Sequence, residues 1–551
     1  MKFTLSWLKE HLDTDASVDE IADTLTLIGL EVEEVADPAK VLGNFRVAEV
    51  VSAQKHPDAD KLQVLQVNTG KETLQVVCGA PNARTGMKGV FASVGTYVPG
   101  IDFTLTKAKI RGVESSGMMV SERELELSDE HTGIIELPAK ARVGSAAAKA
   151  LGLDDVVFDI AITPNRPDCL GVRGVARDLA AAGLGKLKQD TIKPVKGSFD
   201  SSVPVKLEFD TETKDACPVF AGRLVRGVKN GPSPDWMQAR LKAIGLRPIN
   251  ALADITNYIS FDRARPLHVY DADKLSGGIR ARLGKTGESF DALDGKTYKI
   301  DEEMCVIADD RAVLGLGGVM GGEETGCTEE TVNVFIESAY FDPRRTARTG
   351  RTLNIISDAR FRFERGIDPQ SEEFGIEQAT AMVLEMCGGE ASTVTVAGQV
   401  PKANRPFSFD MRLICRLSGL SLSDRKIERI LKALGIALEG DGHTRKAAPP
   451  SWRPDLSIPA DLVEEVVRLT GVDRIPATPL PRLSGVAKPV LTPAQKKARA
   501  VRRLLAARGL VEAVTWSFIP KDEAALFGGG DAALALDHPL STELSQMRPS
   551  L

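Results

Sequence analysis

The sequence predicts a multidomain α+β protein, and three observations lead to this fold class. The chain has 551 residues, too many for one hydrophobic core, and usual domain sizes divide it into about three to five domains. From about Gly43 to Leu137 apolar and polar residues alternate, which predicts a small barrel of β-strands. Outside this stretch, apolar residues recur at helical spacing between short strand-like runs.

The composition excludes several classes of protein. Hydrophobic residues make up 43% and charged residues 26%, and no apolar run approaches the roughly 18 residues of a membrane span. The seven cysteines show no CxxC spacing, so neither a disulfide framework nor a zinc site is indicated. The start, MKFTLSWLKEHLD, is unlike a signal peptide, and we expect a cytoplasmic protein with no membrane contact. A net charge of −6 argues against a general nucleic-acid coat, so any contact with RNA must be local.

The first segment, residues 13–35, predicts a helix followed by a strand. Ser17 and Glu20 have the spacing of a capping box, and Gly29 can end the helix. The apolar residues of its inner face are Ile21, Leu25 and Ile28.

The barrel segment alternates clearly in one run, where Leu74, Val76 and Cys78 share a face. The apolar face switches between Val64 and Leu65, which predicts a β-bulge there. A barrel of this kind offers a strand face to nucleic acids, or it only packs against neighbouring domains. The aromatic platform for stacking single-stranded RNA is thin, and consists of Phe91, Tyr97 and Phe103.

The segment after the barrel, VFDIAITPNRPDCLGVRGVARDLAAAG, predicts a strand, a turn and an amphipathic helix. Its inward residues are Val172, Val175, Ala176 and Leu179. Three arginines, Arg166, Arg173 and Arg177, are candidates for contacts with phosphate or a partner, although solvated arginines are the commoner case. A polar linker near residues 186–202 follows.

The middle of the chain holds three unusual segments. RPINALADITNYISFDRARPLHVYD, which begins at Arg247, collects polar residues around Pro266 as if to line a site. The glycine-dense GLGGVMGGEE does not fit the dinucleotide fingerprint, and its glycines either admit a ligand close to the backbone or form a tight turn. Glu337 lies in the apolar run VFIESAYF, where a buried carboxylate needs a partner or a function. His268 taken alone is more often a satisfied structural histidine.

The C-terminal third predicts a helix capped by Ser423 and closed by Gly435, and a second helix over 461–470. Two helices with short strands between them suit a winged-helix-like module. The acidic residues Asp461, Glu464 and Glu465 share one helical face, with Asp455 before them. Their repulsion is relieved either by a magnesium ion or by pairing with Arg468, and spacing alone favours the second. A basic helix is predicted over 495–508.

The amino-acid sequences of these segments resemble the beta-subunit family of bacterial phenylalanine–tRNA ligases. The three middle segments resemble its editing domain. The barrel segment resembles an OB-fold tRNA-binding domain in the runs HPDADKLQV, VVCGAPN, KIRGVESSGMMVSE and LSDEHTG. The ending HPLSTELSQMRPSL resembles the start of its class II synthetase-like domain.

The resemblance implies five domains. They are an N-terminal α/β domain (1–39 plus 152–195) into which an OB-fold barrel (40–150) is inserted, an editing domain of α+β type (205–397), a winged-helix-like domain with a metal site (402–478), and an incomplete class II synthetase-like domain (485–551). It also implies that the chain is C-terminally truncated relative to the family, and that assembly is impaired as a result.

The resemblance assigns residues and partners as well. A pocket that hydrolyses tyrosine from tRNA(Phe) would be formed by Thr256, Asn257, His268, Gly318 and Glu337. A Mg2+ ion would be held by Asp455, Asp461, Glu464 and Glu465. The chain would work with the alpha subunit in an alpha2 beta2 tetramer, which charges tRNA(Phe) with phenylalanine using ATP at a site on the alpha subunit. Two alternatives are a non-catalytic tRNA-binding scaffold and a winged-helix DNA-binding regulator, the second disfavoured by the acidic helix face.

Overall fold

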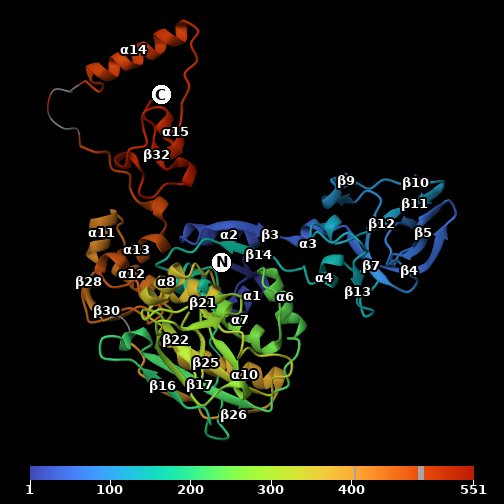
Figure 1. Ribbon diagram of the computed structural model, residues 1–551, viewed down its shortest axis with the longest axis horizontal. Coiled ribbons are helices and arrows are strands. Elements are labelled where there is room, and N and C mark those ends of the chain that lie inside the picture. The colour runs from blue at the N-terminus through green and yellow to red at the C-terminus, as the bar shows by residue number, and fades with distance from the viewer. Residues whose placement is uncertain (191, 403–404, 482–484, 486–488, 551) are drawn as a thin grey trace. The chain divides into compact units, whose positions relative to one another are not determined.

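The computed structural model describes residues 1–551 apart from 191, 403–404, 482–484, 486–488 and 551. It divides into two compact units, Met1–Pro476 and Ala477–Leu551, drawn from blue to orange and in red in Figure 1. Both helices and strands occur throughout, as the predicted α+β class requires. None of the described helices has the length and apolar character needed to cross a membrane.

The N-terminal sheet is built from two separated parts of the chain. Its order is β1-β14-β3 and both pairings are antiparallel, so the chain returns to this sheet after the strands of the barrel segment. The predicted capping box is confirmed, because Ser17 and Glu20 bond each other's backbone N–H groups at the start of α2. The elements are β1 (Lys2–Thr4), α1 (Leu5–His11), β2 (Leu12–Asp13), α2 (Val18–Leu27), β3 (Val32–Ala36), α3 (Pro38–Val41) and β14 (Val157–Ile160).

The barrel segment forms a six-stranded antiparallel sheet of order β12-β7-β4-β5-β6, with β13 also paired to β7. Hydrogen bonds from Val77 N–H to Ser115 Oγ (3.1 Å) and from Ser116 N–H to Gln75 O (2.9 Å) join its two ends, so the sheet curls on itself. Its main strands are β4 (Phe45–His56), β5 (Ala59–Asn68), β6 (Thr73–Cys78), β7 (Lys88–Ser93), β12 (Gly117–Met119) and β13 (Glu136–Leu137), and the short strands β8 (Tyr97–Val98), β9 (Phe103–Thr104), β10 (Ala108–Ile110) and β11 (Val113–Ser115) and helix α4 (Ala147–Leu151) complete it.

The predicted bulge is wrong in its position. β5 pairs regularly with β6 through Val64 and Leu65, whereas the register of β4 shifts between Val50 and Ser52. Val64 is half-buried on the outer side of β5, so its apolar character does not mark a change of face.

Helix α5 (Val172–Ala181) follows β14 and the turn η3 (Pro167–Leu170). Its predicted inner face is confirmed, since Val172, Val175, Ala176 and Leu179 are all fully buried. These side chains belong to a core shared with the N-terminal sheet and with α7.

Residues from about 205 to 398 form three layers. The middle layer is the antiparallel sheet β18-β25-β17, and helices α7 and α10 cover one face of it, where Ile255 and Ile376 meet Ile336. A second sheet, β16-β19-β22-β23-β24, packs on the other face, where Ile307 and Leu314 meet Phe335. Figure 1 shows this region in green and yellow.

The strands of the two sheets are β16 (Val205–Glu208), β17 (Val219–Arg226), β18 (His268–Asp271), β19 (Ile279–Leu283), β22 (Cys305–Ala308), β23 (Val313–Leu316), β24 (Met320–Gly321), β25 (Asn333–Tyr340), β26 (Glu390–Ala391) and β27 (Thr395–Gly398). The helices are α6 (Asp235–Ala243), α7 (Ala251–Arg263), α8 (Pro343–Thr352), α9 (Asp358–Phe363) and α10 (Ser371–Cys387). The hairpin β20 (Ser289–Asp291) and β21 (Thr297–Lys299) lies between β19 and β22 along the chain.

Residues 407–474 form three helices and a three-stranded sheet of order β28-β30-β29. Ser423 caps α12 as predicted, and Gly435 follows its end with a φ of +86°. Helix α13 begins two residues before the predicted 461, at Pro459, and α11 has no counterpart in the prediction. The elements are β28 (Phe407–Asp410), α11 (Arg412–Ser418), α12 (Asp424–Ala433), β29 (Ala437–Glu439), β30 (Thr444–Ala448) and α13 (Pro459–Thr470).

The second unit contains a basic helix and a small two-stranded sheet. The basic helix α14 (Pro493–Ala507) overlaps the predicted 495–508. Strands β31 (Phe518–Ile519) and β32 (Gln546–Met547) pair antiparallel, with α15 (Lys521–Leu526) between them along the chain. Several large apolar side chains of this unit are exposed, among them Val511, Val514 and Trp516.

Candidate functional site

The candidate site lies between the two sheets of the three-layered region. The alternation of β25 directs Phe335, Glu337 and Ala339 toward the second sheet and their neighbours toward the helices. Glu337 is 6% exposed, which confirms the prediction that the apolar run buries this carboxylate. Burial of the ionised Glu337 side chain at this position therefore costs free energy unless the carboxylate has hydrogen-bond partners.

His268 is the direct cross-strand neighbour of Glu337 in the pairing of β18 with β25. Directly opposed residues of an antiparallel pair project from the same face of the sheet, and Tyr270 follows on that face two residues along β18. The rings of His268 and Tyr270 meet edge to face with centroids 4.5 Å apart. The strand pairing therefore brings the side chains of His268, Tyr270 and Glu337 together on one face of the sheet.

Tyr270 is the partner of the buried carboxylate. Its hydroxyl donates a hydrogen bond of 2.5 Å to Oε2 of Glu337. Burial raises the pKa of Glu337 to about 7, against opposing effects of this hydrogen bond and of the Arg265 guanidinium. Glu337 consequently exchanges its proton near neutral pH.

His268 lacks a hydrogen-bond partner at one ring nitrogen. Within the described residues its Nε2 is buried and unpaired, and burial lowers the pKa of the ring to about 4. The imidazole is therefore neutral at physiological pH and can exchange hydrogen bonds with a ligand or a water molecule.

The glycine-dense segment is both a tight turn and a wall of the site. It forms the turn between β23 and β24, with Gly318 at a φ of +72°. A Cβ placed on Gly318 would lie 3.1 Å from Phe341, and one placed on Gly321 would lie 2.2 Å from Cε1 of His268. Glycine at 321 is thus what leaves room for the His268 ring.

These residues line a partly open cavity of about 60 Å³, with His268, Tyr270 and Glu337 on its polar side. Gly318, Met320 and Phe363 contribute to its walls. Its volume is that of about two water molecules, so a larger ligand enters only if lining side chains move. Met320, with a flexible thioether side chain at the half-buried rim, is suited to such movement.

Of the five predicted pocket residues, the structure brings His268, Gly318 and Glu337 together. Thr256 and Asn257 lie on α7 and are not among the residues that line the cavity. Thr256 is buried and donates its hydroxyl to the carbonyl of Ala253 on its own helix. Tyr270 was missed in the sequence analysis, although its place two residues after His268 in one strand was a usable signal.

At the predicted magnesium site, the alternative that spacing favoured, pairing with Arg468, is confirmed for Glu465. Both oxygens of Glu465 accept hydrogen bonds of 2.6–2.9 Å from the guanidinium groups of Arg453 and Arg468. Arg453 also donates to both oxygens of Asp455, at 2.9 and 2.7 Å. Burial alone would raise the pKa of Glu465, but the two guanidinium groups hold it well below its usual range.

The other two predicted ligands lie apart from this pairing. Asp461 accepts hydrogen bonds from the N–H groups of Ser457 (2.7 Å) and Ile458 (2.8 Å), where it caps the start of α13. Glu464 is exposed and forms no hydrogen bond or ion pair among the described residues. The set as arranged does not fit a magnesium ion, because arginines already neutralise its buried members.

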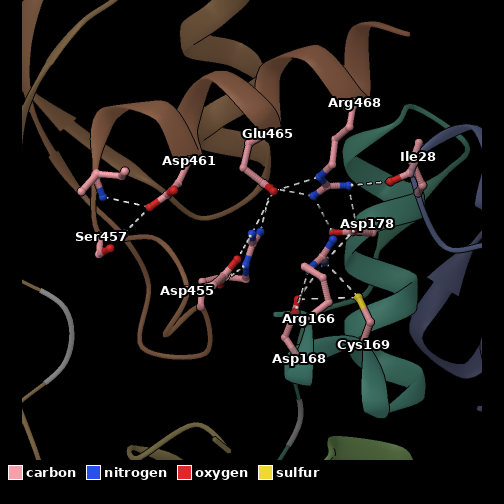
Figure 2. Close-up of polar contacts among 12 residues, drawn as sticks. Ile28, Arg166, Asp168, Cys169, Asp178, Asp455, Ser457, Asp461, Glu465 and Arg468 are labelled. Carbon is pink, nitrogen blue, oxygen red and sulfur yellow. Dashed lines mark hydrogen bonds and ion pairs between the residues drawn. The ribbon is translucent and has the colours of Figure 1, made fainter. Parts of the chain in front are cut away.

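Figure 2 shows that the arginine pairing continues from α13 to Asp178 on α5 and to Arg166. Arg468 donates to Oδ2 of Asp178 on α5 at 2.8 Å, and Arg166 reaches the same oxygen at 2.9 Å. Arg166 also bonds Asp168 at 3.0 Å and the thiol sulfur of Cys169 at 2.9 Å. Among the described residues, Asp168, Cys169 and Asp178 are the one group spaced for a metal, and Arg166 fills its centre instead.

Arg166, which directly precedes η3, is 4% exposed within this network, so it is neither a candidate for contact with phosphate nor a solvated arginine. Arg173 pairs with Asp190 at 3.2 Å, and the guanidinium of Arg177 lies 4.3 Å from the ring centre of Trp452. These arginines hold segments of the protein together.

Comparison with known proteins gives four matches to family models along the chain. They are a tRNA-binding domain (45–146), a B3/4 domain (216–388), a tRNA synthetase B5 domain (407–472) and the phenylalanyl tRNA synthetase beta chain CLM domain (475–551). The candidate cavity lies within the B3/4 match and the arginine network ends within the B5 match. Together the matches define a multidomain chain of the aminoacyl-tRNA synthetase class.

The most similar relatives include the phenylalanine–tRNA ligase beta subunits of Paramagnetospirillum magneticum and Rhodopseudomonas palustris. The first is 54% identical over 551 residues, and the second 55% identical over 553 residues. Both alignments cover 100% of this chain, with 69% and 68% of the relatives' lengths. The chain belongs to the phenylalanine–tRNA ligase beta subunit family.

Among solved structures, an N-terminal fragment of the phenylalanyl-tRNA synthetase beta subunit from Pyrococcus horikoshii is similar over 85% of this chain and 99% of its own. Its sequence identity is 14% and the TM-score is 0.37, which is too low to support an argument about the fold.

Proposed function

We propose that the cavity beside Glu337 hydrolyses tyrosine from misacylated tRNA(Phe). The observation that carries the proposal is the hydrogen bond from the phenolic hydroxyl of Tyr270 to the buried Glu337 carboxylate. The position of Glu337 thus already suits a phenol, the group that distinguishes tyrosine from phenylalanine. Membership of the family and the B3/4 match support the same activity.

Selection follows from the cost of leaving polar groups unpaired. A hydrophobic site rejects an added hydroxyl poorly, whereas a site built to bond a hydroxyl rejects a ligand that lacks it. The Glu337 carboxylate accepts from Tyr270 and retains further acceptor capacity, so a tyrosyl hydroxyl would donate to it whereas a phenylalanyl ring would offer it only an apolar edge. Correctly charged tRNA(Phe) would therefore be spared.

His268 and Gly318 have supporting roles in this proposal. The unpaired Nε2 of a neutral His268 positions a water molecule or the ester group, and Gly318 keeps the opposite wall open. Thr256 and Asn257 belong to the wider predicted site, on a helix whose end leads into β18. The base that activates water is not assigned.

We infer that attachment of phenylalanine to tRNA(Phe) is carried out together with an alpha subunit. In this proposal ATP and Mg2+ serve the activation step on that subunit, in a cytoplasmic alpha2 beta2 tetramer, and this chain provides tRNA contacts and assembly surface. The barrel segment is proposed as the OB-fold that binds tRNA, within the five domain boundaries set out from the sequence. A non-catalytic tRNA-binding scaffold is the second candidate, favoured only by the tRNA-binding match.

Single-turnover hydrolysis of preformed Tyr-tRNA(Phe) tests the proposal. We expect His268→Ala and Glu337→Ala to slow hydrolysis, with Glu337→Ala slower by about tenfold or more, because a hydrogen bond to a charged group contributes about 1.5 to 3 kcal/mol. His443→Ala is a matched control, since this exposed histidine lies in the B5 match.

Phenylalanine activation by the ligase assembled with an alpha subunit should stay within about twofold of wild type in all three variants, because the sites are separate. Unchanged hydrolysis in both pocket variants would reject the cavity as the editing site. Hydrolysis absent from the wild-type protein would favour the scaffold instead.

A further inference from the structure

Helices α8 and α9 form the outer cover of the cavity. A Cβ placed on Gly318 in the cavity wall would lie 3.2 Å from Oγ1 of Thr346 on α8. Phe363 on α9 lines the cavity, and Ser357 at the start of α9 donates a hydrogen bond of 2.5 Å to the carbonyl of Val319. The outer surface of these helices is therefore next to the proposed site.

The outward face of α8 carries three exposed arginines, Arg344, Arg348 and Arg351. Their spacing of four and three residues places them on one side of the helix, opposite the buried Thr346 and Thr349. In the described part of the chain, Arg344 and Arg351 form no ion pair, and Arg348 pairs with Glu303 at 3.0 Å while 63% exposed. This concentration of positive charge occurs in a chain whose net charge is −6.

Apolar side chains are exposed where α8 leads into α9. Ile356 is 89% exposed, and Phe361 is 40% exposed with the guanidinium of Arg365 at 3.6 Å from its ring centre. Exposed apolar and aromatic groups beside arginines are what unstacked nucleic-acid bases bind, because every base has an apolar face.

We propose that the outer surface of α8 and α9 binds the single-stranded 3′ end of the aminoacylated tRNA. The arginines of α8 contact its phosphates, and Ile356 contacts a base. The inference rests on the proposed editing function and adds the route by which the ester reaches the cavity. One helix diameter, about 10 Å, separates the cavity side of α8 from its arginines, so the contacted phosphates belong to nucleotides near the terminal one.

The test is single-turnover hydrolysis of Tyr-tRNA(Phe) as a function of protein concentration and of salt. We expect the triple variant Arg344→Ala, Arg348→Ala, Arg351→Ala to raise the half-saturating concentration about tenfold or more with little change in the limiting rate. Each lost contact with a single strand reduces the slope of log affinity against log salt by about 0.7, so the triple variant should lose about 2. Ile356→Ser should weaken binding without changing the slope.

The matched control is Lys206→Ala, Lys229→Ala, Arg311→Ala, which removes the same charge from exposed positions of the same region. Hydrolysis of 3′-O-tyrosyl-adenosine, which has no phosphate, should be equal in the triple variant and the wild type. Equal loss of affinity in both triple variants, or a normal affinity and salt slope in the α8 variant, would overturn the inference.

A separate binding measurement keeps the inference distinct from the editing proposal. Fluorescence anisotropy with a labelled single-stranded RNA ending in CCA should show weaker binding by the α8 variant than by the control variant, whether or not hydrolysis occurs. Equal anisotropy curves would contradict the α8 surface, while absent hydrolysis of Tyr-tRNA(Phe) by the wild type would contradict the editing proposal alone.

Discussion

The hydroxyl of Tyr270 donates a 2.5 Å hydrogen bond to Glu337 across two paired strands, although 67 residues separate them in the chain. Both residues are nearly fully buried, between two sheets. Without this donor, Glu337 would have no hydroxyl partner in an apolar layer. Tyr270 thus positions the carboxylate and lowers its pKa.

Tyr270→Phe should move the pH dependence of editing to higher pH. The hydrogen bond lowers the pKa of Glu337, which burial raises to about 7, so its loss raises that pKa further. If the ionised carboxylate bonds the substrate phenol, the rate rises with pH through this pKa, and the midpoint of the variant lies above that of the wild type. The measurement is the limiting single-turnover rate on Tyr-tRNA(Phe) from pH 5.5 to 9.

The other titratable groups around Glu337 are Arg265, Cys217, Cys305 and His268. Burial raises the pKa of both thiols, and that of His268 is lowered to about 4, so none of them changes charge near pH 7. A variant that lost rate at every pH with an unmoved midpoint would show that Tyr270 is only structural.

Glu337→Gln should stabilise the protein at pH 8 relative to wild type and have little effect at pH 4.5. The pKa of Glu337 is about 7 in the folded protein against 4.5 for the ordinary group, so folding disfavours its ionised form. The stability of the wild type therefore falls as pH rises from 4.5 to 7, by up to about 3 kcal/mol for this group, and glutamine has no such loss. Thermal unfolding of both proteins at pH 4.5 and pH 8 gives the comparison. A difference that is the same at both pH values would contradict the raised pKa.

Local features of this protein were predictable because they depend on neighbours in the chain. The Ser17 cap and the buried face of α5 follow from spacing within one helix. Burial of Glu337 followed from the apolar run around it. The glycine turn was predicted only as a choice between a turn and a ligand wall, and the structure makes it both.

Contacts set by strand pairing and domain packing were not predictable from one sequence. The partner of Glu337 depends on the register of β18 against β25. The carboxylates near α13 resemble a metal site in sequence, but Glu465 is also neutralised by Arg453, and Arg468 also bonds Asp178 290 residues away. Spacing within α13 predicts the pairing of Glu465 with Arg468, but not the pairing with Arg453, which lies outside the helix.

Gly321→Ala should impair editing by displacing His268. A Cβ at this position would lie 2.2 Å from the imidazole, so the ring must move, with a stability cost of about 1 to 3 kcal/mol for the forced packing. Gly231→Ala in the same domain is the control, since its Cβ would meet nothing within 4 Å. We expect a loss of at least tenfold in hydrolysis of Tyr-tRNA(Phe) for the first variant and none for the second. Normal hydrolysis by Gly321→Ala would show that the position of His268 does not matter.

Glu465→Ala should destabilise the protein strongly, and Glu464→Ala should not. Removing Glu465 leaves the guanidinium groups of Arg453 and Arg468 without their shared buried carboxylate, and breaking such a pair costs about 3 to 5 kcal/mol. Glu464 is exposed at the preceding position of the same helix, so its loss should cost less than about 0.5 kcal/mol. Denaturant unfolding of the two variants beside wild type measures both effects.

The same arrangement predicts that chelation of magnesium leaves the stability of this region unchanged. The pKa of Glu465 is held below its ordinary value, so its ion pairs contribute stability above pH 4.5 that is lost as pH falls below that value. This loss should occur equally with EDTA and with added Mg2+, because arginines and not a cation neutralise the carboxylate. Stabilisation by Mg2+ that disappears in Glu464→Ala would show instead that a metal site forms on this helix.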